Sequence, residues 1–199
     1  MIIGLTGSIA SGKSTASRKL ASLGARVLDA DVFSREAVAP GSEGLKTIAE
    51  RFGNGVMLPD GSLDRRAMAA IVFSNSEKRE LLNSIIHPIV LRRLFEGTKA
   101  APPDTIVVWD VPLLLECGWQ KHCDRVWLIT AAEETRIARI VARDGSTVEA
   151  ARSRVRSQMS DGEKALYADN VIYNDADEGT FLKSIERLYK ETAAANGRK

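Results

Sequence analysis

The apolar residues of the chain gather in five short runs, which are separated by longer stretches of mixed polarity. The runs lie at 2–5, 26–28, 105–109, 125–129 and 171–173. They are nearly continuous in apolar residues and do not alternate with polar ones, which is typical of strands buried on both faces. We therefore predict five strands of a parallel sheet.

The stretches between these runs have the spacing of amphipathic helices. They predict helices at 13–23, 132–143, 147–159 and 178 to about 194, and a mostly helical segment at 32–98. Strands that alternate with helices predict an α/β fold, in which helices flank the sheet. We predict a core of residues 1–31 and 99–199, with a substrate-binding helical insertion at 32–98.

The first predicted strand runs directly into a glycine-rich loop. Residues 7–14 read GSIASGKS, which matches the phosphate-binding pattern G-x-x-x-x-G-K-[ST]. Glycine at both ends of the loop allows the backbone N–H groups to turn onto phosphate oxygens. The lysine can reach the β- and γ-phosphates, and the serine hydroxyl after it can ligate Mg²⁺. We expect nucleotide contacts from Gly7, Ser8, Ile9, Ala10, Ser11, Gly12, Lys13, Ser14 and Thr15.

Carboxylates follow the second and third predicted strands, where ligands of parallel sheets bind. Asp31 is our candidate for a general base that accepts a proton from an attacking hydroxyl; alternatively it caps the next helix. Asp29 lies nearer the strand and is expected to cap or orient. Asp110 could hold Mg²⁺ directly or through water, or serve only as a strand-end turn residue. Glu116 is a weaker acidic candidate.

Three arginines recur at helical spacing in the stretch after the fourth predicted strand: Arg136, Arg139 and Arg143. Guanidinium groups match the charge that develops on a transferred phosphoryl group. We predict a helical lid at about 136–160, with Arg139 and Arg143 acting on the phosphates. For Arg136 we favour a place on a solvated face beside Glu133 and Glu134.

Composition and charge exclude several classes of protein. The net charge of +2 lacks the strong basic excess of nucleic-acid binders, and no apolar run is long enough to span a membrane. Cys117 and Cys123 are too few for a disulfide scaffold, and the start of the chain lacks the pattern of a signal peptide. We therefore expect a cytoplasmic protein. Beside His122, the two cysteines lack a fourth ligand at zinc-site spacing.

A phosphate-binding loop is compatible with a kinase, a GTPase or an ATP-binding module of a larger machine. The N-K-x-D motif of GTPases and the LSGGQ-like motif of transport ATPases are both absent. We favour a small-molecule kinase. A nucleoside monophosphate kinase, whose phosphate acceptor needs no general base, and a nucleotide-dependent regulatory module remain as alternatives.

An ordered set of motifs along nearly the whole chain resembles the dephospho-CoA kinase family. The set comprises GLTGSIASGKST at 4–15, DAD at 29–31, PG at 40–41, FG at 52–53, DGSLDR at 60–65, HP at 87–88, VPLLLE at 111–116, RD at 143–144, RVRSQ at 154–158 and ADNVIYN at 168–174. The resemblance implies a P-loop kinase core with a helical CoA-binding domain and a lid. The implied reaction is ATP-dependent phosphorylation of the ribose 3′-hydroxyl of dephospho-CoA, which gives CoA and ADP.

The resemblance also implies roles for individual residues. Asp31 matches the proposed general base of the family, Lys13 and Ser14 its ATP site, and Asn174 the approach to the adenine. Because the acceptor carries a pyrophosphate and a pantetheine arm, we expect its contacts among Leu63, Arg65, Arg66, Ile86, His87, Arg92 and Arg93. The expected partners are ATP with Mg²⁺ and dephospho-CoA, without nucleic acid or membrane, in a monomer or small homo-oligomer.

The loop departs from the common family form GGIGSGKS at two positions. Ser8 and Ala10 replace two glycines, neither of which belongs to the bare phosphate-binding pattern. We expect ATP binding to be retained. Ala10 would stiffen the loop slightly if its backbone keeps a negative φ.

Overall fold

The computed structural model describes residues 1–197, which divide into two compact units. One unit comprises residues 1–28 together with the chain from Ala101 onward, and the other comprises Asp29–Ala100. The strands are β1 (Ile2–Gly7), β2 (Arg26–Asp29), β3 (Val107–Asp110), β4 (Arg125–Thr130) and β5 (Asn170–Tyr173). They form one sheet in the order β2-β3-β1-β4-β5, and the predicted α/β fold with a five-stranded parallel sheet is confirmed.

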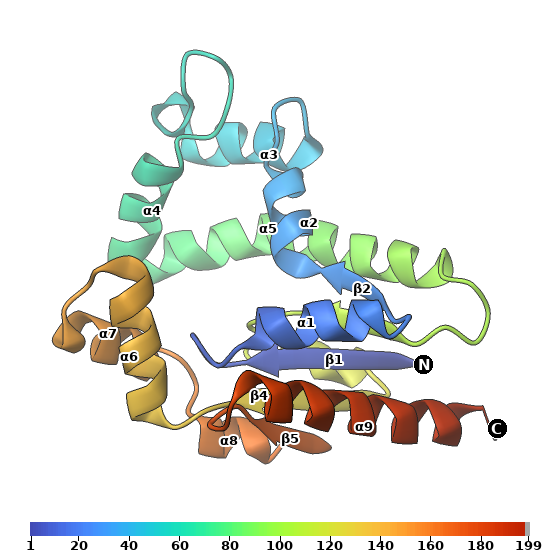
Figure 1. Cartoon of the computed structure of the whole chain (residues 1–199). Helices are drawn as coiled ribbons and strands as arrows, with labels where there is room; N and C mark the ends of the chain where they lie inside the picture. Colours follow the sequence, from blue (N-terminus) through green and yellow to red (C-terminus); the bar gives the residue numbers. More distant parts are fainter. Residues whose placement is uncertain (198–199) are drawn as a thin grey trace. The chain divides into compact units, whose positions relative to one another are not determined.

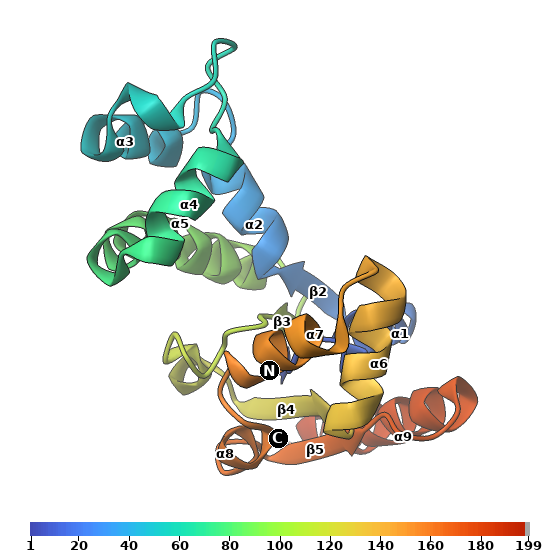
Figure 2. The same cartoon turned by 90° about the vertical axis from the view of Figure 1, so that its left-hand side faces the viewer.

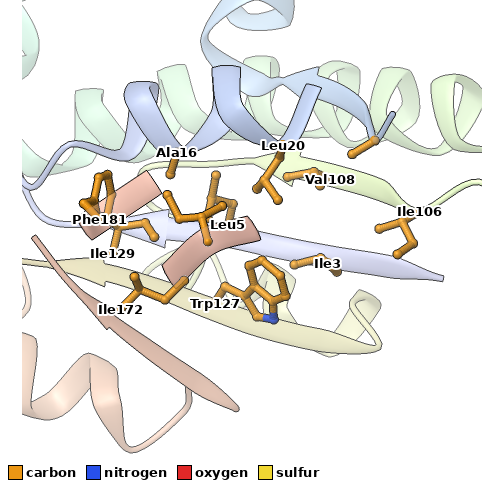
Figure 3. Packing of buried hydrophobic residues seen from close by; sticks show 12 residues of the cluster. Ile3, Leu5, Ala16, Leu20, Ile106, Val108, Trp127, Ile129, Ile172 and Phe181 are labelled. Atoms are coloured by element: carbon orange, nitrogen blue, oxygen red, sulfur yellow. The ribbon is translucent and has the colours of Figure 1, made fainter. Parts of the chain in front are cut away.

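The central strand β1 is covered on both faces, which explains why its sequence is apolar without alternation. On one face, Ile3 and Leu5 pack against buried residues of two helices, α1 (Lys13–Ser22) and α9 (Glu178–Asn196), as Figure 3 shows. On the other face, a Cβ added to Gly4 would lie 2.6 Å from Leu114 and 2.8 Å from Cys123. Trp109 and Trp127 are fully buried, so the tryptophans of β3 and β4 belong to the core.

Three further helices follow β4 in the same unit: α6 (Glu133–Asp144), α7 (Val148–Arg156) and the five-residue α8 (Asp161–Ala165). Helices α6 and α7 pack side by side (Figure 2), and their buried residues form a small cluster against which Ile9 and Ala10 lie. The sequence predicted a helix over 147–159, and α7 is that helix, although it ends earlier, at Arg156. The helix that begins at Asp161 was not predicted.

The separate α8 has a local cause that the periodicity did not reveal. Ser160 caps this helix in a capping box, because its hydroxyl accepts from the N–H of Glu163 while the Glu163 carboxylate accepts from the N–H of Ser160. Since a capping residue has an extended backbone, the helical stretch must stop before it. A short segment, residues 157–160, therefore joins α7 to α8.

The second unit is helical apart from an isolated bridge between Met57 and Leu63. Its elements are α2 (Ala30–Ala37), α3 (Glu43–Phe52), the 3₁₀ turn η1 (Asn54–Val56), α4 (Arg65–Ser74) and α5 (Ser76–Lys99), which Figure 1 shows. They surround a core of Val38, Ile48, Val56 and Met68.

The first unit also contains the 3₁₀ turn η2 (Trp119–His122). Within the described residues, no helix combines the length and the apolar character needed to cross a membrane.

Candidate active site

The glycine-rich loop connects β1 to α1, as the phosphate-binding pattern requires. Gly12 stands at the N-cap position of α1 with φ +97°, a left-handed conformation that favours glycine. Glycine is needed at position 7 for a different reason: a Cβ added to Gly7 would lie 2.7 Å from both the Ile129 carbonyl oxygen and the Ser11 hydroxyl. Both ends of the loop therefore need glycine, one for its backbone angles and the other for close packing.

Ala10 also adopts the left-handed conformation, with φ +61°. The condition under which alanine would stiffen the loop, a negative φ, is therefore not met. A Cβ in this conformation crowds the following carbonyl, at a cost of about 1 kcal/mol. The loop keeps this strained residue because neighbouring elements hold it in place.

The Lys13 ammonium forms an ion pair with the Asp110 carboxylate at the end of β3. The Lys13 side chain is 17% exposed and that of Asp110 only 6% exposed, so the pair is largely shielded from water. Ser14 follows in the first turn of α1 and is exposed. The ammonium of Lys13 and the hydroxyl of Ser14 thus lie at the start of α1, and the ammonium contacts the carboxylate at the end of β3.

Arg139 of α6 and Asn174, which follows β5, both contact the loop. The Arg139 guanidinium donates to the Ala10 carbonyl at 3.2 Å and to the Asn174 carbonyl at 2.9 Å. The Asn174 amide in turn donates to the Ser11 carbonyl at 2.9 Å. A cavity of about 310 Å³ lies here, lined by Ala10, Gly12, Thr15, Arg139, Asn174, Ala176, Glu178 and Phe181.

Arg136 is not on a solvated face, so that expectation is wrong. It is only 7% exposed, its Nε donates to the Ala131 carbonyl at 3.0 Å, and its Nη2 lies 2.9 Å from the Asp161 carboxylate. The expected partners Glu133 and Glu134 pair with Arg152 of α7 instead. A buried guanidinium group is costly unless it is paired and hydrogen-bonded, and Arg136 has both kinds of contact.

Arg143 is exposed and bonds to its neighbour Asp144 through both Nε and Nη2, at 2.7 and 3.1 Å. Hydrogen bonds from Arg143 and Arg154 lower the pKa of Asp144 to about 2, and the Asp144 hydrogen bond raises the pKa of Arg143. The structure therefore brings Arg139 to the loop, whereas Arg143 contacts Asp144.

Two residues that follow α7, Gln158 and the first residue of α8, Asp161, also contact the loop, and they were not predicted from the sequence. The Gln158 side chain accepts from the Ile9 N–H at 2.9 Å, and the Asp161 carboxylate accepts from the Ser8 hydroxyl. A usable signal was present, because the S-x-x-E spacing of a capping box marks a helix start at Ser160.

In the second unit, Asp29 caps α2, since its Oδ1 accepts from the N–H groups of Asp31 and Val32 at 2.8 and 3.2 Å. The capping role expected of Asp29 is thus confirmed. Asp31 is the second residue of that helix and is exposed. It lies in the first turn of the helix, where the positive end of the helix dipole favours a charged carboxylate.

The candidate acceptor residues of the second unit differ in their surroundings. Leu63 and Ile86 pack against the core of the unit. Arg65 begins α4 and is exposed, while His87 is half-buried, so desolvation lowers the pKa of its imidazole. Two further arginines have acidic partners, Arg92 with Glu43 at 3.5 Å and Arg93 with Glu36 at 2.8 Å.

The two cysteines and Glu116, which were weaker candidates for chemistry, have surroundings that suit a structural role. Burial raises the pKa of the Cys123 thiol to about 12 and also raises that of Cys117. Glu116 lies 3.1 Å from the ammonium of Lys164, whose side chain is fully buried. No cluster of three or more metal-binding side chains occurs among residues 1–197.

Known proteins match this chain along its length. The family model for dephospho-CoA kinase matches residues 1–179. The dephospho-CoA kinase of Geobacter metallireducens is 40% identical over 202 residues, which covers 100% of both chains, and that of Leifsonia xyli is 48% identical over 174 residues, which covers 86% of this chain and 88% of that protein.

A solved structure agrees with this match. The dephospho-CoA kinase from Campylobacter jejuni has a TM-score of 0.75 at 27% identity, with 98% of each chain covered. The sequence match, the shared fold and the phosphate-binding loop between β1 and α1 lead to one assignment. This chain belongs to the dephospho-CoA kinase family.

Proposed function

We propose that this chain transfers the γ-phosphoryl group of ATP to the ribose 3′-hydroxyl of dephospho-CoA, which yields CoA and ADP. The observation that carries the proposal is the loop Gly7–Ser14, which has the phosphate-binding geometry in a chain that matches dephospho-CoA kinases over nearly its full length. In phosphoryl transfer the protein contributes positioning and charge stabilisation rather than covalent chemistry.

The donor site is supported by the surroundings of the loop. The N–H groups of the loop and the start of α1 attract phosphate oxygens. Lys13 is held by Asp110, so its ammonium has an ordered position from which a phosphate oxygen can replace the carboxylate. The cavity beside Thr15, Arg139 and Asn174 is our candidate for the adenine and ribose, because it continues from the loop.

Magnesium fits the oxygen donors of this site. The hydroxyl of Ser14 is exposed at the start of α1, and the Asp110 carboxylate ends β3. Mg²⁺ binds through one or two such oxygens together with substrate phosphates rather than in a cage of side chains. Ser14 would ligate the ion, and Asp110 would hold it directly or through water. When bound, the ion would offset the negative charge of the β- and γ-phosphates.

Asp31 is the proposed general base, which would orient the 3′-hydroxyl and accept its proton. Its place just after the end of β2 supports this role, because ligands of parallel sheets bind beyond the carboxyl ends of the strands. The helical unit Asp29–Ala100 is the proposed acceptor domain, corresponding to the insertion at 32–98. Within it, Arg65 and His87 are the candidates for polar contacts, and Leu63 and Ile86 for apolar ones.

The lid is proposed to comprise α6, α7 and the segment up to residue 160. Arg139 would act on the nucleotide directly, since it already contacts the loop. Arg143 would have to exchange Asp144 for a phosphate oxygen. We place the enzyme in the cytoplasm, because Cys117 and Cys123 are free thiols, which suits a reducing compartment.

The proposal is tested by ADP release with Mg·ATP and a panel of acceptors: dephospho-CoA, AMP, CMP, UMP, adenosine and pantetheine. We expect strong turnover with dephospho-CoA and none above the background ATP hydrolysis with the other compounds. Turnover with a nucleoside monophosphate alone would contradict the proposal, as would ATP binding without transfer to any acceptor.

A further inference from the structure

The Asp161 carboxylate joins three parts of the first unit. Its Oδ1 accepts from the Ser8 hydroxyl of the phosphate-binding loop. Its Oδ2 accepts from the Thr130 hydroxyl at the end of β4, at 2.8 Å, and pairs with Arg136 of α6 at 2.9 Å. One side chain therefore connects the loop, the sheet and the first lid helix.

This carboxylate has a fixed position. Asp161 is the first residue of α8, whose start is held by the capping box of Ser160 and Glu163. Its partner Arg136 is 7% exposed and is held in addition by the Ala131 carbonyl. Ser8 is 4% exposed, so its hydroxyl has little water with which to exchange this hydrogen bond. Hydrogen bonds to an ionised group in such surroundings are the strong ones.

A second contact acts at the next residue of the loop. The Ile9 N–H donates to the Gln158 side chain at 2.9 Å, and the Ile9 side chain packs on the cluster between α6 and α7. The segment 158–161 thus holds two consecutive loop residues. These residues directly precede Ala10, whose strained backbone persists only where its surroundings determine it.

We propose that Asp161 and Gln158 are positioning residues for the nucleotide phosphates, which act through Ser8 and Ile9 and not by touching the substrate. They hold the loop in the form in which its N–H groups face the phosphates. Because both residues lie in the short stretch of chain just beyond the end of α7, they also link the conformation of the lid to that of the loop. The inference rests on the proposed function only in that the loop binds nucleotide phosphates.

The test compares the binding of ADP to the wild-type protein and to Ser8→Ala, Asp161→Asn and Gln158→Ala, by titration calorimetry with Mg²⁺ and without acceptor. We expect Ser8→Ala to raise the Kd of ADP about tenfold or more, as loss of one hydrogen bond to a charged group implies. Gln158→Ala should raise it about fivefold. The KM for dephospho-CoA should stay within twofold of wild type.

The matched control is Ser157→Ala, which removes an exposed serine hydroxyl next to Gln158 in the chain. That hydroxyl donates to the Arg154 carbonyl at 2.8 Å, within its own part of the chain and not to the loop. We expect Ser8→Ala to melt a few degrees below Ser157→Ala, because it removes a buried hydrogen bond to a carboxylate and not an exposed local one, and both variants should stay folded at the temperature of the ADP titration. Of these two serine variants, only Ser8→Ala should weaken ADP binding.

The double variant Ser8→Ala/Asp161→Asn decides whether the two residues act together. If they do, adding Ser8→Ala to Asp161→Asn changes the Kd of ADP less than twofold. Additive losses, or a Kd for Ser8→Ala equal to that of Ser157→Ala, would overturn the proposal. If Asp161→Asn does not fold, the comparison of Ser8→Ala with Ser157→Ala decides alone. A protein that binds ADP as described but fails to phosphorylate dephospho-CoA would refute the proposed function and leave this inference standing.

Discussion

At the scale of single residues, the loop is built from a few positions with unusual demands. Gly12 and Ala10 both have positive φ, but only Gly12, which has no Cβ, adopts it without strain. The pattern in the sequence predicted the loop and its glycines, because the spacing is characteristic. It did not predict the backbone angle of Ala10, since an alanine gives no sign of a left-handed conformation that its neighbours impose.

Replacement of Ala10 by glycine should stabilise the protein. The substitution removes the strain of the left-handed alanine but adds freedom to the unfolded chain, so we expect a gain of about 0.5 kcal/mol in the free energy of unfolding. Urea denaturation measures it. Ala69→Gly, in the middle of the ordinary helix α4, is the control and should cost about 1 kcal/mol. Equal losses for both variants would show that Ala10 is not strained.

Asp31 can be tested against its neighbour in the same helix start. Asp31→Asn should lower kcat about 10²- to 10⁴-fold and change KM for either substrate little, because loss of a general base affects the transition state. Asp29→Asn is the control, since asparagine caps helices as well as aspartate does. A kcat for Asp31→Asn within threefold of that for Asp29→Asn would remove Asp31 from the role of base.

At the scale of elements, helix α6 shows what periodicity can and cannot predict. The spacing of Arg136, Arg139 and Arg143 correctly predicted a helix with arginines three and four residues apart. It could not predict that the three guanidinium groups have different partners. Arg136 contacts residues 131 and 161, Arg139 contacts residues 10 and 174, and Arg143 contacts residue 144. Long-range partners depend on how α6 packs, which local sequence does not encode.

Arg139 should matter for nucleotide binding because it bridges the loop and the strand end of β5. Arg139→Ala removes two hydrogen bonds to carbonyl groups, and we expect it to raise the Kd of ADP about tenfold or more. The control Arg187→Ala removes an exposed arginine of α9, 79% exposed, and should leave the Kd unchanged. Equal Kd values for the two variants would contradict the account of this site.

The contact between α1 and α9 should make stability depend on acidity. Hydrogen bonds from Lys19 and Lys190 lower the pKa of Glu186 to about 2. A lowered carboxyl pKa stabilises the fold above the ordinary value near 4.5, and this contribution disappears as the pH falls towards 2. The difference in melting temperature between wild type and Glu186→Gln should thus shrink between pH 5 and about pH 2. The control Glu191→Gln should show a small difference at every pH, whereas a constant difference for Glu186→Gln would refute the effect.

At the scale of the whole molecule, the sheet was predictable and much of the site was not. Strands such as β4 are buried on both faces, so their composition alone revealed them. The loop was recognisable because its chemistry lies within eight consecutive residues. The contacts of Asp161 and Gln158 with the loop could not be predicted, because about 150 residues of chain separate them from the loop.

The central claim is that this chain phosphorylates one particular hydroxyl group, and the position of the new phosphate tests it most directly. Dephospho-CoA is incubated with Mg·ATP and the protein, and the product is examined by phosphorus NMR and mass spectrometry. The account predicts a single new phosphomonoester on the ribose 3′-oxygen, formed together with one equivalent of ADP. A phosphate on another oxygen, or ADP and inorganic phosphate without a phosphorylated acceptor, would contradict it.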